Sequence, residues 1–361
     1  MESNVSKMTE NSNNLYVGMD IHKKQWSICI RTSDFEHRKF TQPANPILLR
    51  DYINQNFPTY QVTCAYEAGC FGFWISEKLQ SYGYRCLVLN PADIPGSDKE
   101  SKQKTDHNDC RKIARELSKG EIKGVFQPDL TQQCFRNLFR QRNQVVKQLR
   151  QVKCQIRSLL SFHGILVDEQ YENNNWSNAF KKWLQELPFG ETNGRQTLDS
   201  MLRRLKFLHD EFLLIERELR QYVRTHHRQE YELLRSIPGI GSVVAIAVMS
   251  ELGDLSRFKT ADNLCSYVGL VPNIYQSGDT VRVKGLTNRC KFLLRSYFIE
   301  SAWVAVGKDP EMIAYYKRHA GKKVAGKIIV KVARKLLLRM YYCMKYQRPY
   351  RLNHSQSTTQ R

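Results

Sequence analysis

The chain has 361 residues, 41% of them hydrophobic, and its 56 Lys and Arg against 35 Asp and Glu give a formal net charge of +21 at pH 7. This length and apolar content predict two or three globular domains and exclude a disordered chain. The positive charge favours a polyanionic partner, either nucleic acid or an anionic membrane surface. No apolar run approaches the ~18 to 20 residues needed to cross a bilayer, so we expect no membrane-spanning segment.

Residues 14–125 are predicted to form an α/β domain. A polar lead-in at 1–13 precedes it, and we expect this lead-in to be disordered rather than a signal peptide. Apolar runs predict five strands, at residues 15–21, 26–32, 36–42, 61–68 and 84–90. Helices are expected after the third and the fourth of these strands. After a polar linker at 91–105, a helix from Asp106 to Gly120 completes the α/β layers.

Residues 126–228 are predicted to form a helical coiled-coil region. Seam positions spaced by 3.5 residues, as in a coiled coil, fall at Phe135, Leu138, Arg142, Val145, Leu149, Val152, Ile156 and Leu159. Arg142 is the polar exception, and we expect it to fix the register. A second helix at about 197–235 is the expected partner, and the segment between the two helices is expected to be a loop-rich connection.

Residues 229–345 are predicted to form a mostly helical domain, followed by a disordered basic tail at 346–361. A helix pair flanks "IPGIG" at 237–241, and further helices are expected near 288–306 and 321–345. Ten cysteines occur without a Cys-x-x-Cys pair or a histidine at zinc-ligand spacing, so we expect reduced thiols in a cytoplasmic protein.

The positive charge is concentrated in two segments. Residues 131–165 carry seven Lys and Arg and no acid, and residues 312–361 carry thirteen and no acid. We expect both segments to bind nucleic-acid backbones, although a solvated basic face is the alternative. The candidates for phosphate contact in the second segment are Lys323, Lys327, Lys331 and Arg334.

Four carboxylates are candidates for a metal site. Asp20 closes the first predicted strand and Glu67 the fourth, while Asp106 and Asp109 are three residues apart on one helix and share a face. Four such charges at one edge of a sheet require cations, and oxygen-only ligands favour Mg²⁺ or Mn²⁺. Two such ions activate a hydroxyl and stabilise phosphodiester displacement. Taken singly, each residue also fits a helix-capping or surface role.

The "IPGIG" connector is a second candidate site. Gly239 and Gly241 permit a tight turn, and the amides at the start of the following helix offer an anion site for a nucleic-acid phosphate. This arrangement is similar to a helix-hairpin-helix element. The alternative is an ordinary connector between two helices.

Ser277 is the candidate nucleophile. It lies in "IYQSGDTVRVKG", which predicts a β-hairpin, and Arg282, Lys284 and Arg289 follow it as candidates for holding a phosphate. Attack by a hydroxyl conserves phosphodiester energy on the protein without ATP. No histidine lies near Ser277, so we expect the base to be a metal-bound hydroxide or a carboxylate from the other domain. In isolation, Ser-Gly-Asp is also an ordinary turn.

These motifs together resemble the DEDD transposases of the insertion-sequence 110 family, which include the Piv-like DNA invertases. The N-terminal resemblance is carried by "GMDIHKKQW", "AYEAGCFGFW" and "KTDHNDCRKIA", and the C-terminal one runs from "IPGIG" through Ser277 to "KIIVKVARKLLLRMYY". The sequence departs from the family pattern at Gln276, where a second serine is frequent, and in the run after Gly285, where Arg289 remains.

The resemblance implies an RNase H/RuvC-like fold for the first domain, with Asp20, Glu67, Asp106 and Asp109 binding Mg²⁺. It also implies that Ser277 joins covalently to DNA, and that a structured bridge RNA guides a dimer or tetramer to donor and target DNA. We therefore expect an RNA-guided DNA transposase or recombinase whose partners are DNA, RNA and its own copies, with no membrane. The alternatives are a Holliday-junction-type endonuclease, a DNA invertase without a guide, and a non-enzymatic architectural protein.

Overall fold

The computed structural model describes residues 13–95, 106–172, 176–277, 280–322 and 324–352. The expected lead-in, most of the linker at 91–105 and the end of the tail therefore lie outside the described residues. The chain divides into two compact units, Met1–Gln127 and Pro128–Arg361. No helix among the described residues is long and apolar enough to cross a membrane.

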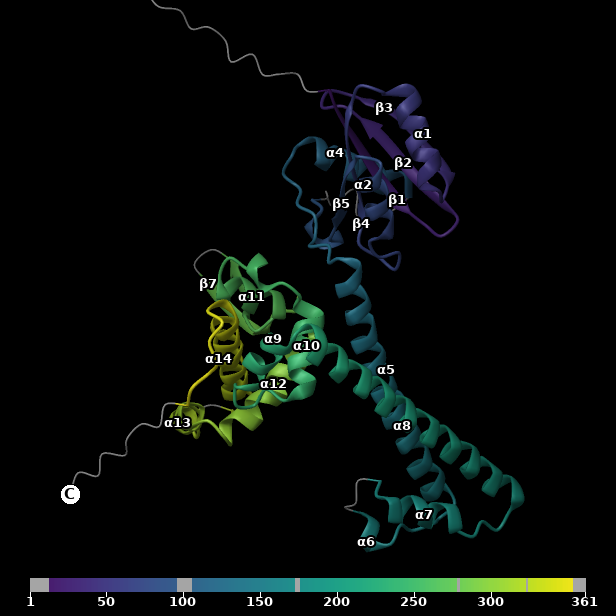
Figure 1. The fold of residues 1–361 in the computed structure, drawn as a ribbon, viewed down its shortest axis with the longest axis vertical. Coiled ribbons are helices and arrows are strands. Elements are labelled where there is room, and N and C mark those ends of the chain that lie inside the picture. Colours follow the sequence, from purple (N-terminus) through teal and green to yellow (C-terminus); the bar gives the residue numbers. More distant parts are fainter. Residues whose placement is uncertain (1–12, 96–105, 173–175, 278–279, 323, 353–361) are drawn as a thin grey trace, which may run out of the picture. The chain divides into compact units, whose positions relative to one another are not determined.

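The N-terminal unit is built on a five-stranded sheet with the strand order β3-β2-β1-β4-β5 (Figure 1). Its strands are β1 (Asn14–Ile21), β2 (Gln25–Arg31), β3 (Glu36–Pro43), β4 (Gln61–Glu67) and β5 (Arg85–Leu89). β1 pairs antiparallel with β2 and parallel with β4. The α/β class and the five strands agree with the sequence prediction, because each strand is an apolar run bounded by polar turns.

Helices cover both faces of this sheet. Side chains of α1 (Pro46–Asn56) and α2 (Trp74–Ser81) share one core with Leu15, Val17 and Met19 of β1. α4 (Asp106–Ser118) packs on the other face through Cys110, Ile113, Ala114 and Leu117. A strand covered on both faces is apolar throughout, which explains the continuous apolar run of β1.

Gly18 of β1 is the point of closest approach between the sheet and α4. A Cβ atom at this position would lie 2.1 Å from the carbonyl oxygen of Cys110 and 2.4 Å from the backbone nitrogen of Ala114. Both are backbone atoms, which cannot give way as a flexible side chain does. The absence of a side chain at Gly18 is therefore what allows α4 to pack against β1.

The second unit is helical and contains one small hairpin. Two long helices, α5 (Leu130–Phe162) and α8 (Thr192–His226), pack along each other, as the sequence predicts. Between them lie the short α6 (Glu169–Glu172) and α7 (Asn178–Glu186). The predicted loop-rich connection is thus wrong at α7, whose Phe180 and Leu184 are buried. Its two apolar anchors are too few to show a helical period.

The seam of α5 differs from the heptad prediction at both ends. Phe139 and Leu160 are buried, whereas the predicted Leu138 and Leu159 are only half-buried. Phe139 lies against the ring of Tyr297, with ring centroids 6.1 Å apart, so this end of α5 faces α12 as well as α8. A strict 3.5-residue seam holds only where a helix has a single long partner.

The rest of the second unit comprises α9 (Arg228–Arg235), α10 (Ser242–Leu252), α11 (Ala261–Val268), β6 (Pro272–Ser277), β7 (Thr280–Leu286), α12 (Phe292–Val306), α13 (Pro310–His319) and α14 (Ala325–Lys345). Apolar side chains of the helices among these elements form one continuous core with α5 and α8. α12 begins at Phe292, later than the predicted 288, and the sequence prediction missed α13. Asp309 caps α13 by accepting hydrogen bonds from the backbone nitrogens of Glu311 and Met312.

Candidate functional site

Asp20 and Glu67 lie at the carboxyl ends of two neighbouring parallel strands, β1 and β4, at the same edge of the sheet. The β1–β4 register pairs Met19 with Tyr66, and Asp20 and Glu67 are the next residues on their strands. The parallel order therefore brings these two strand ends together. Asp20 is partly buried and Glu67 is exposed. The Oδ2 atom of Asp20 lies 3.2 Å from Nε2 of His22, a residue that the sequence analysis did not include in the site.

The helix α4, on which Asp106 and Asp109 occur, covers the face of the sheet on which Asp20 lies. Gly18 and Asp20 are two residues apart on β1 and so face the same side, the side that α4 covers at Cys110. Burial first, and then the charge of the Asp20 carboxylate, raise the pKa of the Cys110 thiol to about 11. Asp109 precedes Cys110 directly, so its helical turn lies beside Asp20.

A divalent cation would need several of these oxygens around one point. The donor set is all carboxylate, which suits Mg²⁺ or Mn²⁺. Within the residues that the structure describes, however, no three His, Cys, Asp or Glu side chains lie close enough to hold a metal ion. The side chain of Asp106 lies outside the described residues. The metal site therefore stays a prediction that depends on Asp106 and on a closer approach of the other three.

Ser277 ends the first strand of a β-hairpin, as predicted. β6 and β7 are antiparallel, with Ser277 opposite Thr280 and Tyr275 opposite Arg282. The turn residues 278–279 and the side chains of Ser277 and Lys284 lie outside the described residues. Arg282 and Arg289, the other two predicted phosphate contacts, are exposed.

An arginine of α12 and an arginine of α14 bind protein groups near this hairpin. Arg295 of α12 donates a hydrogen bond from Nη1 to the carbonyl oxygen of Thr287 at 2.7 Å. Arg334 of α14 forms an ion pair with Asp262 of α11 at 2.7 Å. Arg334 was a predicted phosphate contact, and in the structure it connects α14 to α11. Sequence analysis missed Arg295, whose role depends on a backbone carbonyl.

The "IPGIG" connector is a tight turn between α9 and α10. Gly239 has a φ of +97°, and a Cβ atom there would lie 2.5 Å from the carbonyl oxygen of Ser301 on α12. Gly241 is the N-terminal capping residue of α10, and the Tyr231 hydroxyl donates to Oγ of Ser242 at 2.9 Å. Packing against α12 thus accounts for Gly239, and the phosphate role of Gly239 and Gly241 stays a prediction.

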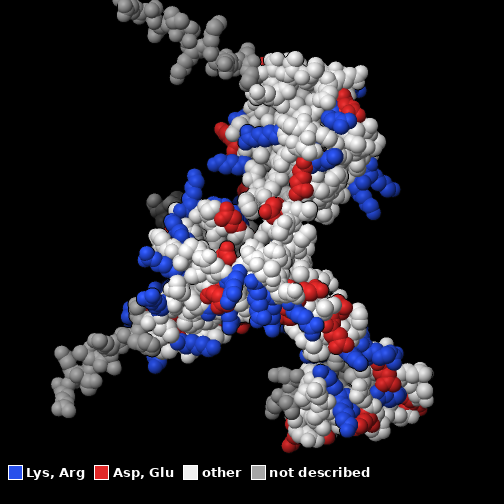
Figure 2. Space-filling model, in the orientation of Figure 1, with Lys and Arg blue, Asp and Glu red and all other residues white. Residues whose placement is uncertain are grey.

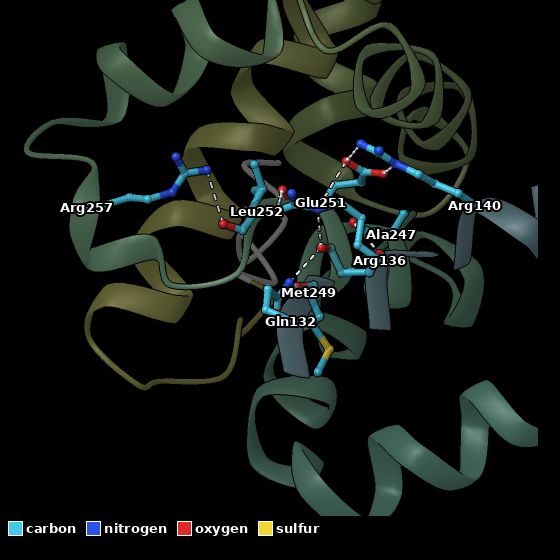
Figure 3. A network of polar contacts seen from close by, with 9 residues as sticks. Gln132, Arg136, Arg140, Ala247, Met249, Glu251, Leu252 and Arg257 are labelled. Atoms are coloured by element: carbon cyan, nitrogen blue, oxygen red, sulfur yellow. Dashed lines mark hydrogen bonds and ion pairs between the residues drawn. The ribbon is translucent and has the colours of Figure 1, made fainter. Parts of the chain in front are cut away.

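Several cations of the basic segment 131–165 bind protein groups. Figure 3 shows Gln132, Arg136 and Arg140 of α5 around the C-terminal end of α10. Gln132 donates to the carbonyl oxygens of Met249 and Ser250 at 2.8 and 2.6 Å. The last carbonyl groups of a helix have no hydrogen-bond partner within the helix. Cations near them also interact favourably with the negative end of the helix dipole.

Glu251 completes this network. Arg140 donates from Nε and Nη2 to its two carboxylate oxygens, at 2.7 and 2.8 Å. Arg142, further along α5, forms an ion pair with Glu216 of α8 at 2.7 Å. Arg136, Arg140 and Arg142 therefore bind protein groups in the structure, and the expectation that the segment contacts nucleic acid stays a prediction. The acceptors of these arginines lie 74 or more residues away, where sequence reading does not connect them.

Other cations of the two basic segments remain on the surface. Lys327 and Lys331 are exposed and lie one turn apart on α14, whereas Lys323 lies outside the described residues. Lys and Arg side chains cover much of the helical unit in the view of Figure 2. These exposed lysines are in a suitable place for the predicted phosphate contacts.

Two family models match the chain. The transposase model of the IS110 DEDD type matches residues 17–165, which include all four candidate carboxylates. The model described as "Transposase IS116/IS110/IS902 family" matches residues 231–317, which include Ser277. Together the two matches cover well over half of the chain.

Similar proteins include two transposases and a pilin gene-inverting protein. The transposase for insertion sequence element IS1533 of Leptospira borgpetersenii is 25% identical over 257 residues, or 69% of this chain and 72% of that protein. The transposase for IS1111A of Coxiella burnetii is 27% identical over 252 residues, or 67% of this chain and 65% of that protein. The pilin gene-inverting protein of Moraxella lacunata is 24% identical over 348 residues, or 93% of this chain and 97% of that protein.

Three observations lead to one assignment. They are the α/β unit with carboxylates at one sheet edge, the hairpin whose first strand ends in Ser277, and the two matched family models. The protein belongs to the IS110 family of DEDD transposases, enzymes that act on DNA by cleavage and strand transfer.

Proposed function

We propose that this transposase cleaves DNA through a covalent intermediate on Ser277, guided by a structured RNA and assisted by Mg²⁺ at the carboxylates. The Ser277 Oγ–phosphorus bond forms while a phosphorus–oxygen bond of the DNA strand breaks. A base takes the serine proton, and the leaving oxygen of the DNA takes up a proton. The phosphate ester is conserved on the protein, so strand transfer needs no nucleotide triphosphate.

The hairpin register is the observation that carries the role of Ser277. Opposite residues in an antiparallel pair share a face, and so do residues two apart on a strand. Positions 277, 280 and 282 therefore share one face of the hairpin. Arg282 is exposed, and we propose that its guanidinium holds the phosphate that Ser277 attacks.

The carboxylates are proposed as the second half of the active site. Asp20, Glu67, Asp106 and Asp109 would hold the ion, and the sheet order with α4 on β1 supports an RNase H/RuvC-like domain. When bound, Mg²⁺ would stabilise the charge that develops on the phosphate and lower the pKa of the attacking hydroxyl. No histidine other than His22 lies near Asp20 in sequence, and the hairpin segment contains none. The carboxylates are thus the proposed source of the base, from the same or another subunit of a dimer or tetramer.

The test combines two substitutions, each with a matched control. Ser277→Ala should abolish strand exchange and the covalent protein–DNA species, and leave nucleic-acid binding intact. Asp20→Asn should also abolish strand exchange. Ser266→Ala and Asp34→Asn, which change exposed residues elsewhere on the same units, should retain it. Normal recombination by Ser277→Ala would overturn the nucleophile, and release of free 5′-phosphate ends without an adduct would favour a simple endonuclease.

The guide is tested separately from the chemistry. The purified protein should carry a discrete structured RNA, and nuclease digestion of that RNA should abolish recombination that adding it back restores. The pilin gene-inverting relative matches over nearly its full length, which favours site-specific inversion as the second candidate function. Recombination of paired DNA sites after RNA removal would support that alternative.

A further inference from the structure

Three lysines are among the residues that line a small cavity in the helical unit. The cavity has a volume of about 210 Å³ and lies between α5, α7 and α8. Lys153 comes from α5, Lys181 from α7, and Lys206 and His209 from α8. Three lysines from three separate helices therefore converge on one point, which is distant in sequence from the carboxylates and from Ser277.

These lysines lack a neutralising partner. None of the described residues that line the cavity is acidic, and within the described part of the chain none of the three lysines forms an ion pair. The neighbouring Lys182, by contrast, lies 3.7 Å from Glu186. Burial lowers the pKa of Lys153, and the charges of Lys181 and Arg157 lower it further. The cavity is therefore electropositive and favours an anion.

The remaining lining suits a phosphate with part of its nucleotide. Trp176 is 8% exposed, and the Lys153 ammonium lies 5.5 Å from its ring centroid. Gln185 adds an amide, and leucines complete the apolar wall. Lysine binds phosphate as a point charge without a demand for planar geometry, and a cavity of this size admits one phosphate and its sugar.

We infer that the cavity formed by Lys153, Lys181 and Lys206 holds a backbone phosphate of the nucleic acid on which the transposase acts. The inference rests on the nucleic-acid-binding part of the proposed function and not on the chemistry of Ser277. The site anchors a strand at the helical pair α5–α8, at a distance in sequence from the residues that break it. A free phosphate or mononucleotide presents the same chemistry, and the experiment separates it from a strand.

The test compares two adjacent lysines of α7. Lys181→Gln and Lys182→Gln remove the same charge from the same helix, but only Lys181 lines the cavity. Binding of labelled DNA, and of the copurifying RNA, is measured against salt concentration in the Ser277→Ala background, so that cleavage does not contribute. Lys181→Gln should weaken binding and reduce the slope of log affinity against log salt concentration by about 1. The double variant Lys153→Gln/Lys181→Gln should reduce this slope by about 2, whereas Lys182→Gln should change neither the affinity nor the slope.

Two outcomes would overturn the inference. One is equal affinity and equal salt slope for Lys181→Gln and Lys182→Gln, with unchanged helicity of both. The other is a site for free phosphate. In that case inorganic phosphate or a mononucleotide would raise the melting temperature, and Lys181→Gln would abolish this rise without changing the affinity for DNA or RNA strands. Adduct formation is measured separately in variants that keep Ser277. An adduct retained by Lys181→Gln alongside either result would show that the proposed function survives without this site.

Discussion

Arg142 on α5 donates a hydrogen bond from Nε to Oε1 of Glu216 on α8 at 2.7 Å, and the two side chains are only 11% and 9% exposed. Glu216 also accepts from Arg220 at 3.0 Å. Arg142 occupies the one polar position of the predicted seam. The ion pair forms in only one register of α5 against α8. If either helix shifted along the other, a buried charge would lose its partner.

Removal of one partner of this pair should destabilise the helical unit strongly. We expect Arg142→Met to lower the free energy of unfolding by about 3 kcal/mol, because Glu216 then loses its most buried partner. The double variant Arg142→Met/Glu216→Leu should recover most of that loss, since no unpaired charge remains. Urea unfolding followed by helix circular dichroism measures both. Arg150→Met, an exposed change on the same helix, should stay within about 0.5 kcal/mol.

A methyl group at Gly18 should displace α4 from the sheet. Gly18→Ala would place its Cβ 2.1 Å from the Cys110 carbonyl oxygen. Overpacking of a core ordinarily costs about 1 to 3 kcal/mol, and we expect the upper part of that range because the neighbours are backbone atoms. Recombination should also fall, since α4 carries Asp106 and Asp109. Thermal unfolding and strand exchange measure the two effects.

Gly69→Ala provides the control for this substitution. A Cβ there would lie 4.0 Å from its nearest neighbour, the Glu67 carbonyl oxygen. Its melting temperature should therefore match that of the parent protein. If Gly18→Ala proved as stable and as active as Gly69→Ala, the close approach of α4 would not be needed for the site.

The N-terminal unit should lose stability at alkaline pH because of its buried thiols. Burial raises the pKa of Cys86 from 9.0 to about 12. Below pH 9 the thiol is protonated in both states. Above it the unfolded chain releases the proton that the folded chain retains, so rising pH favours unfolding up to about pH 12.

The slope from this single thiol is about 1.4 kcal/mol per pH unit in that window. Free energies of unfolding measured at several values between pH 8 and pH 11 should therefore fall less steeply for Cys86→Ala than for the parent protein. The comparison of slopes is independent of the cavity that the substitution creates, which lowers all values alike. Parallel curves for the two proteins would exclude a proton retained on Cys86.

The local elements were predictable because each has a local cause. The apolar runs of β1 and β4 predicted strands, and the turn-forming stretch after Gln276 predicted the hairpin that now places Ser277 opposite Thr280. The helix α7 was missed because only Phe180 and Leu184 of its described residues are fully buried, with Trp183 partly buried beside them. The seam of α5 was predicted correctly at its centre and differed at Phe139, where a third helix contributes.

The sequence by itself determined the family motifs, the order of the candidate carboxylates and the position of Ser277 in a hairpin, since all of these depend on neighbours along the chain. Only the tertiary structure decided which cations are free. Arg140 and Arg142 form ion pairs with Glu251 and Glu216, whereas Lys153, Lys181 and Lys206 line one cavity and form no ion pair within the part of the chain that the structure describes. Charge along a sequence is additive, but its neutralisation depends on distances between helices that only folding sets.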